Sequence, residues 1–342
     1  MRLAVATHSF LCVFDLGDDW QVRDCHLVAE GHHYGIGPEP ANESFIAVEN
    51  ARGRQERDGL SWTRYADDGD FSDLESGALP AHIDDAHQIA LRGDGFYVAN
   101  TAKNSIEYVY QDDRPAETYH FGGHQTDINH VNSVYPAGEN QLFVVLHNTH
   151  TAAGISEIAV MKHTPGERFE LVRRARLWHQ GCHNVYVEPP IVVYNASPNG
   201  EFCIYDVERR SFRSKLTLPG HTKGLAATDS YFILGFSEHA SRKQRFTSEG
   251  RLAVVDRQSL EVVDTVDLNV DALPHPIGNV NEVRLLGRRD LAHRRTSGIV
   301  DDAAAYALAN HDPKERLRYG WRTGSHWYSR PIFALSELFK RP

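Results

Sequence analysis

One short pattern recurs along this chain: a brief apolar run, a turn, a second apolar run that ends in small or amide residues, and then two weaker strands. Five of the first runs open on a histidine and a sixth opens on an asparagine. These residues are His33, His87, His130, His183, His221 and Asn281. Successive copies begin about 40 to 60 residues apart, which is the size of one blade in a repeat fold with variable loops. We therefore expect a β-propeller in which each run is the innermost strand of a blade.

The individual runs have the composition of strands. One copy reads from His87 through a Gly-Asp-Gly turn to Thr101, and another reads from His183 through Pro-Pro to Ser197. Such segments are short, rich in β-branched and aromatic residues, and bounded by Gly, Pro, Asn or Asp. Long helical periodicity is absent from this region, which argues against alternating strand and helix units.

The two ends of the chain predict how the ring closes. The strand pattern stops after residue 286, which leaves the run at Asn281 without partners, whereas residues 3–7, 10–16 and 21–27 resemble three strands. We expect six blades, with seven as the alternative, and a last blade built from one C-terminal and three N-terminal strands, because closure removes open sheet edges.

The composition changes beyond this propeller, which we place at residues 1–288. Residues 289–342 are expected to form a C-terminal extension, with a short helix at 301–309 and an aromatic segment at 319–331. The aromatic segment is too apolar for a disordered tail, so we expect the extension to pack on a propeller face.

Charge and composition narrow the range of partners. The 342 residues carry a formal net charge of -10, the pI is about 6.0, and no apolar stretch is long enough to span a membrane. We expect a cytoplasmic protein with a small-molecule substrate and with neither a nucleic-acid nor a membrane partner. The four cysteines form no Cys-x-x-Cys pair and are expected to be reduced thiols.

Histidines that head successive inner strands would all reach the same end of the central channel. Neutral imidazole is a common ligand of zinc, iron and manganese, and three or four converging rings leave a coordination position open. We therefore expect a divalent zinc, manganese or iron ion. Its predicted ligands are His87, His130, His183 and His221. His33 is less secure because His32 competes for its register. The alternative is that these histidines are structural and bind neighbours such as Asp84, Asp85 and Asp127.

The second strand of a propeller blade ends on the face where the inner strand begins, so its last residues would surround the histidines. Polar side chains occupy these ends. The predicted substrate-binding residues are Asn50, Arg52, Asn100, Asn148, Asn195 and Arg242. Glu238 and His147 are the candidates for acid–base catalysis or for support of the metal ligands. The two arginines suit a carboxylate or phosphate. Motifs for a nucleophilic serine, a dinucleotide or a P-loop are absent.

The repeat, seen best from His87 to Ile106, resembles the NHL-like and lyase-type β-propellers over residues 1–288. The resemblance implies metal-binding histidines in the axial funnel, as in peptidylglycine amidating lyases and oligosaccharide lyases. A ring of four histidines is also similar to the iron site of carotenoid cleavage oxygenases.

Together these observations predict a metal-dependent propeller enzyme that carries out elimination or hydrolysis on a small polar or anionic substrate. A ferrous oxygenase with four histidine ligands is the first alternative. A propeller that binds a ligand or a protein without catalysis is the second. The metal, the substrate and the oligomeric state stay open.

Overall fold

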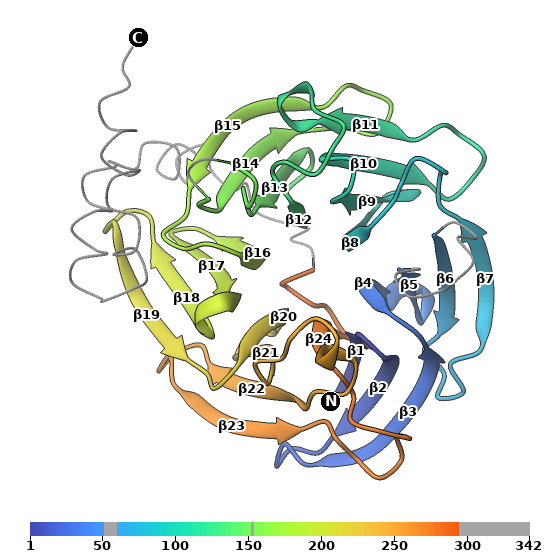
Figure 1. Cartoon of the computed structure of the whole chain (residues 1–342). Helices are drawn as coiled ribbons and strands as arrows, with labels where there is room; N and C mark the ends of the chain where they lie inside the picture. The colour runs from blue at the N-terminus through green and yellow to red at the C-terminus, as the bar shows by residue number, and fades with distance from the viewer. Residues whose placement is uncertain (51–59, 152–153, 294–342) are drawn as a thin grey trace.

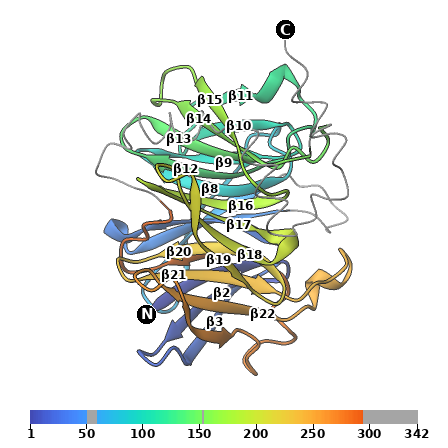
Figure 2. The ribbon, with the colours of Figure 1, turned by 90° about the vertical axis from the view of Figure 1, so that its left-hand side faces the viewer.

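The computed structural model describes residues 1–50, 60–151 and 154–293, and these residues form six four-stranded antiparallel sheets arranged in a ring (Figure 1). The predicted six-bladed β-propeller is confirmed. Figure 2 views the ring from the side of its fourth blade. The connections in the described chain are loops and four short 3-10 helices: η1 (Pro40–Asn42), η2 (Phe121–Gly123), η3 (Ser197–Asn199) and η4 (Gln244–Phe246).

Each blade runs from an inner strand at the axis to an outer strand at the rim. Blade 1 contains β4 (His33–Glu39), β5 (Ser44–Glu49), β6 (Ser61–Ala66) and β7 (Asp73–Ala78). Blade 2 contains β8 (Ala86–Arg92), β9 (Gly95–Asn100), β10 (Ser105–Tyr110) and β11 (Glu117–His120). Blade 3 contains β12 (Val131–Ala137), β13 (Gln141–Leu146), β14 (Glu157–Lys162) and β15 (Glu170–Arg176).

The second half of the ring follows the same order. Blade 4 contains β16 (Cys182–Glu188), β17 (Ile191–Ala196), β18 (Glu201–Asp206) and β19 (Ser211–Thr217). Blade 5 contains β20 (His221–Ala227), β21 (Tyr231–Ser237), β22 (Gly250–Asp256) and β23 (Val262–Asp267). Blade 6 contains β24 (Val280–Leu285), β1 (Arg2–Thr7), β2 (Phe10–Leu16) and β3 (Val22–Glu30).

Blade 6 joins the two ends of the described chain, as the sequence predicts. In this blade Val5 of β1 is paired with Val283 of β24 on one side and with Cys12 of β2 on the other. All three side chains are fully buried. Apolar side chains of blades 5 and 6 pack together across the space between the sheets, so hydrophobic burial holds the ring closed.

Every inner strand carries a break in its pairing register near its first residues. After each break the inner strand returns to regular pairing with the second strand of its blade. The residues that lie two positions before this return occupy equivalent positions in the six blades. They are His33, His87, Val131, His183, Lys223 and Val280. A β-bulge bends its strand and re-aims the side chains beside it. The six breaks therefore turn one level of each inner strand toward the axis.

Gly224 allows the break in blade 5. Its φ is +80°, and an added Cβ would lie 2.7 Å from Val283 Cγ2 and 2.9 Å from the Val283 nitrogen. Gly224→Ala is therefore expected to lower the free energy of unfolding by about 2 to 4 kcal/mol, through backbone strain and overpacking together. The measurement is urea denaturation.

Gly138 provides a matched control for this substitution. It has a φ of +61° but no atom within 4 Å of an added Cβ, so Gly138→Ala carries the backbone strain without the clash. We expect it to cost about 1 kcal/mol. Equal losses for the two variants would show that close packing at Gly224 is unimportant.

The chain after β24 crosses the end of the channel opposite the histidines. Leu291 donates its N–H to the carbonyl of Ala227 at 2.9 Å, and its own carbonyl accepts from the hydroxyl of Tyr135 at 3.3 Å. His293 Nε2 accepts from the N–H of Leu91 at 3.2 Å. These contacts reach blades 2, 3 and 5, so this segment closes that end of the channel. The predicted helix and aromatic segment lie outside the described residues.

Candidate functional site

A series of aromatic rings lines the histidine end of the channel. The centroids of successive rings lie 4.3 Å apart from His8 to His32, then 4.6 Å to Tyr34, 4.3 Å to His87, 5.6 Å to His130, 4.8 Å to His147 and 4.4 Å to His183. We call the last four rings, His87, His130, His147 and His183, the imidazole arc. The arc spans blades 2, 3 and 4. The structure thus gathers three of the four predicted metal ligands and adds His147, the predicted acid–base residue.

Hydrogen bonds fix the tautomer of His183. Its Nδ1 lies 2.9 Å from the carbonyl oxygen of Gly181 and 2.6 Å from Ser197 Oγ. A carbonyl oxygen can only accept, and the Ser197 hydroxyl already donates to the carbonyl of Thr222. Nδ1 of His183 therefore carries the proton, and its Nε2 presents a lone pair.

The same assignment holds for the neighbouring rings of the arc. The Thr101 hydroxyl donates to the carbonyl of Val131 at 2.5 Å, so it accepts from Nδ1 of His87 at 2.7 Å. His130 donates Nδ1–H to the carboxylate of Asp127 at 2.9 Å. Metal-binding histidines commonly donate their other ring nitrogen to a carboxylate, a carbonyl or another acceptor in this way.

His147 has a ring nitrogen, Nε2, that is buried and finds no hydrogen-bond partner among the residues that the structure describes. Burial, followed by the charges of His130 and Lys223, lowers the pKa of His147 well below its usual value. Burial and then Lys223 also lower the pKa of His183. Both rings are neutral at pH 7, and the unsatisfied Nε2 of His147 favours a bound donor or cation.

Lys223 occupies the position in blade 5 that histidine holds in blades 1, 2 and 4. Its Nζ lies 5.4 Å from the centre of the Tyr34 ring in blade 1, which places the ammonium across the channel from blade 5. His221 lies two residues earlier. Its Nδ1 donates to the carbonyl of Ser197 at 3.2 Å, and its ring contacts that of His239 at 4.5 Å. In the described part of the chain no ring contact joins His221 to the imidazole arc.

A buried polar network forms the floor beneath the arc. Gln88 donates to the carboxylate of Glu282 at 2.6 Å, and Asn184 donates to the same group at 3.2 Å. Arg284 Nη2 lies 3.3 Å from that carboxylate. These side chains come from blades 2, 4 and 6, so they converge on the axis and separate the arc from the far end of the channel.

The asparagines predicted to bind substrate make internal hydrogen bonds. Asn50 donates to Asp85 at 2.8 Å. Asn100 donates to Glu107 at 2.5 Å, Asn148 donates to the carbonyl of Ile155 at 2.8 Å, and Asn195 donates to the carbonyl of Gly224 at 3.2 Å. The structure places these amides in loop and blade contacts rather than among the rings.

The predicted charged residues lie apart from the arc. Glu238 and Arg242 are exposed on the loop after β21, and Glu238 accepts from the N–H of Glu249 at 3.4 Å. Arg52 lies outside the described residues. Lys223, which lies at the histidine level of the inner strands, was not among the predicted residues. The Thr-Lys-Gly sequence at 222–224 carries the available signal, because glycine inside a strand indicates a bulge and hence a change of register.

A second group of potential metal ligands lies between the strands of blade 4. His179, Glu201 and Cys203 are the described residues that bring three ligand atoms within 4.8 Å of one another. However, Nδ1 of His179 lies 3.1 Å from the Tyr194 hydroxyl, its Nε2 lies 3.1 Å from Glu201, and Lys215 lies 2.7 Å from the same carboxylate. Burial raises the pKa of the Cys203 thiol. A protonated thiol and a carboxylate already neutralised by lysine are a poor fit to a cation.

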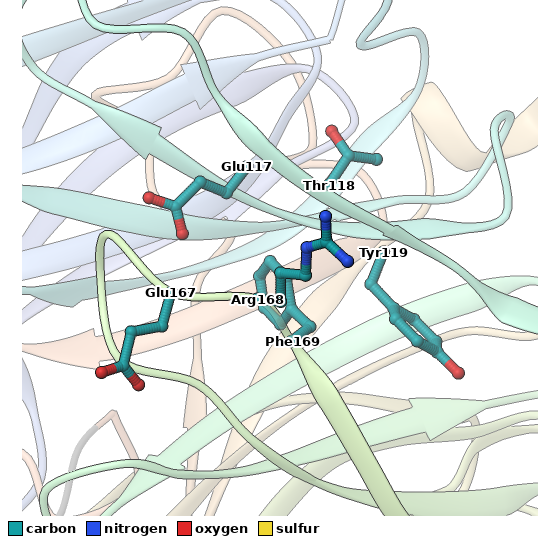
Figure 3. A pocket seen from close by; sticks show the side chains of 6 residues that line it. All are labelled: Glu117, Thr118, Tyr119, Glu167, Arg168 and Phe169. Atoms are coloured by element: carbon teal, nitrogen blue, oxygen red, sulfur yellow. The ribbon is translucent and has the colours of Figure 1, made fainter.

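A shallow depression of about 380 Å³ lies at the rim, between β11 and the loop leading into β15 (Figure 3). It is lined by Glu117, Thr118, Tyr119, Glu167, Arg168 and Phe169. Glu117 pairs with His163, and the His163 ring is stacked on Phe169 at 3.7 Å. These contacts hold the edge of blade 2 to the loop after β14 and indicate a structural role.

Comparison with known structures shows that other proteins share the β-propeller fold. No protein-family description matches the sequence, and no curated protein matches it. The structure is similar to a chain of a nidogen/laminin complex, with a TM-score of 0.59, 10% identity, and coverage of 84% of this chain and 99% of that one. It is also similar to a protein of unknown function from Bacteroides caccae, with a TM-score of 0.58, 11% identity, and coverage of 84% of this chain and 99% of that one.

A third similar structure is a putative 6-phosphogluconolactonase from Bacteroides fragilis, with a TM-score of 0.52, 10% identity, and coverage of 82% of this chain and 96% of that one. Identities this low establish the shared fold and leave the chemistry to be argued from the site. The described residues contain no helix that is long and apolar enough to cross a membrane.

Proposed function

We propose that this protein is a metal-dependent enzyme that carries out hydrolysis or elimination on a small anionic substrate at the imidazole arc. His87, His147 and His183 are the proposed ligands of a zinc, manganese or ferrous ion. His130 is the proposed general base. This proposal retains the lyase-type function that the sequence suggests. Of the four predicted ligands it keeps His87 and His183, omits His221 and makes His130 the base, and it adds His147, which was predicted as an acid–base residue.

The unsatisfied Nε2 of His147 is the observation that carries the proposal. It is buried beside the neutral ring of His183, whose Nδ1 donates its proton and whose Nε2 therefore carries a lone pair. The Nδ1 atom of His87 likewise donates, to the hydroxyl of Thr101. Two imidazoles on one ion have centres about 4.5 to 5.5 Å apart, since metal–nitrogen bonds are about 2.0 to 2.1 Å long. Among the proposed ligands, the rings of His147 and His183 are in contact, with centres 4.4 Å apart. The His87 ring contacts that of His130 at 5.6 Å, and the His130 ring contacts that of His147 at 4.8 Å. The nitrogen atoms of the arc are more widely spaced than those of a bound set, so binding an ion requires the rings to move inward.

The residues around the arc suit both parts of the proposed reaction, activation by the metal ion and proton transfer by a base. A bound divalent ion would supply Lewis acidity to a carbonyl, a leaving group or a water. His130 is more exposed than His87 or His147, and the hydrogen bond from its Nδ1 to the Asp127 carboxylate orients its ring and leaves Nε2 as the acceptor nitrogen. Lys223 faces the arc and can hold a negative group of the substrate. The four cysteines are free thiols, which supports the proposed cytoplasmic location.

Elemental analysis tests the metal site directly. We expect about one ion per purified chain, with His147→Asn and His183→Asn each reducing this to below about 0.2 because each removes one of three ligands. His221→Asn and the buried control His163→Asn are expected to retain the ion. Wild-type protein that stays below about 0.2 ions after addition of zinc, manganese or ferrous iron would overturn the proposal.

The charge of Lys223 favours a second candidate function. An ammonium beside the arc opposes a nearby divalent cation and attracts an anion, which suits a metal-free propeller that binds an anion without converting it. The same elemental analysis separates the two functions, because this candidate predicts wild-type protein without metal.

A further inference from the structure

The loop between β21 and β22, residues 238–249, reaches over the histidine end of the channel. It contains η4 and is held to blade 6 and its flanking turns. Ser9 Oγ donates to the carbonyl of Phe246 at 2.6 Å, and the N–H of Asn279 donates to the carbonyl of Arg245 at 2.7 Å. The Phe246 ring lies 5.4 Å from that of His8. The loop therefore carries residues of blade 5 across to the entrance beside blade 6, close to the inner end of β24 in Figure 1.

Arg245 is placed by this loop beside two imidazoles. Burial and then the charge of Lys223 lower the pKa of His8 to about 3, and the charge of Arg245 adds to this effect. Burial is also the first cause of the lowered pKa of His221, to which His239, Arg245 and Lys223 contribute. Arg245 Nε is buried and has no hydrogen-bond acceptor within the described part of the chain. The guanidinium thus has a donor available within reach of the channel.

Lys223 and Arg245 act on the same two neighbours, His8 and His221. Lys223 is buried, and the ring contacts of Tyr34 place its ammonium near the end of the arc at His87. Both neighbouring imidazoles donate Nδ1–H to backbone carbonyls, those of Asn279 and Ser197. The Tyr34 ring, 5.4 Å from the Lys223 ammonium, has its centre 6.1 Å from that of His8, and Phe246, the neighbour of Arg245, has its ring 5.4 Å from the same imidazole. Two cations in the surroundings of one neutral imidazole favour the binding of an anion.

We propose that Lys223 and Arg245 form an anion subsite that binds the carboxylate or phosphate group of the substrate next to the imidazole arc. The subsite deepens the proposed function and rests on it for the identity of the ligand as a substrate. Binding of the anion itself requires only the two cations. Each cation can donate a charge-assisted hydrogen bond to the anion. Because arginine donates from a rigid planar fork, these bonds give the subsite its selectivity for oxyanions.

Calorimetric titration with inorganic phosphate and with malonate tests the subsite. We expect binding to wild-type protein, and a loss of about tenfold or more in affinity in Lys223→Met and in Arg245→Gln, because each removes a charge-assisted hydrogen bond. Arg245→Lys should restore part of the affinity. Arg242→Gln, on the same loop but exposed, is the matched control and should bind like wild type. The tighter of the two probes identifies the preferred anion, phosphate or carboxylate.

Metal content measured on the same samples separates this inference from the proposed function. If wild-type protein contains no metal but binds an anion, and Lys223→Met and Arg245→Gln weaken that binding, the subsite is supported and the metal site is overturned. A full complement of metal with no binding of either probe, or with binding that Lys223→Met and Arg245→Gln leave unchanged, would overturn the subsite. Circular dichroism on each variant confirms that it is folded before it is titrated.

Discussion

Replacing Arg284 by methionine is expected to lower the free energy of unfolding by about 3 to 5 kcal/mol at pH 7. The guanidinium is 1% exposed, lies 3.3 Å from Glu282, and donates to the carbonyl of Leu225 at 2.6 Å. Burial raises the pKa of both Glu282 and Asp290, and the charge of Arg284 opposes that rise. Methionine fills similar space but leaves two buried carboxylates without this cation.

The pH dependence of this loss identifies its cause. Without Arg284 both carboxyl pKa values rise further, so the variant is penalised most where the unfolded carboxyls are ionised, above about pH 5. The penalty should shrink as the pH falls below that value. Urea denaturation at pH 7 and pH 4.5 measures it. Arg23→Met, which removes an exposed pair with Asp19, should cost less than about 1 kcal/mol. A loss below 1 kcal/mol for Arg284→Met at pH 7 would contradict the assignment.

Stability should also fall in mild acid, and His8 supplies one part of the change, beside His147 and His183. Its pKa is about 3 in the folded protein, against about 6.5 for an unperturbed histidine. Between these values the unfolded chain binds the proton and the folded chain does not. The contribution of His8 is therefore complete above pH 6.5 and is lost by up to about 1.4 kcal/mol per pH unit as the pH falls toward 3.

Urea denaturation from pH 7.5 to pH 4.5, on protein dialysed against EDTA, measures this slope without any metal release. His8→Gln cannot take up the proton and should flatten the curve below pH 6.5. Glu201, with a pKa of about 2, adds a further loss only below about pH 4.5, so Glu201→Gln should leave the slope over this pH range unchanged. Parallel curves for wild type and His8→Gln would refute the role of His8.

The ring of blades could be predicted from the sequence because each blade repeats the same alternation of apolar runs and turns. Blade 6 could be predicted because an unpartnered inner strand at Asn281 and three spare strands at the N-terminus complete each other. Both arguments depend on the pattern of apolar runs and turns. This pattern can still be recognised when the alignment of two blades is wrong by one residue.

Residue roles at the axis were harder to predict, because they depend on register. A β-bulge changes the count of residues without changing the apolar pattern, so aligning the blades on histidine equated His221 with His183, whereas the pairing equates Lys223 with His183. In blade 3 the break in register places Val131 at the level that His87 holds in blade 2. The imidazole of this blade, His147, comes instead from the residue that follows β13.

Long-range placement limited the rest of the site. Asn100 and Asn195 follow apolar strands as a funnel residue would, yet Glu107 and Gly224, which bind them, belong to other strands. Arg245 lies in a polar loop whose path over the channel depends on Ser9 and Asn279, which are distant in sequence. The contacts of Asn195 with Gly224, and of the loop with Ser9 and Asn279, cannot be recognised from the residues next to them in the sequence.

Blade 6 has a consequence for synthesis of the protein. The strands β1, β2 and β3 leave the ribosome first, but β24, which pairs with β1, leaves after nearly the whole propeller has been made. Until then the edge of β1 lacks its partner, and an unpaired strand edge can pair with other chains. A chain that stops before Val280 cannot form this pairing and leaves the edge of β1 exposed.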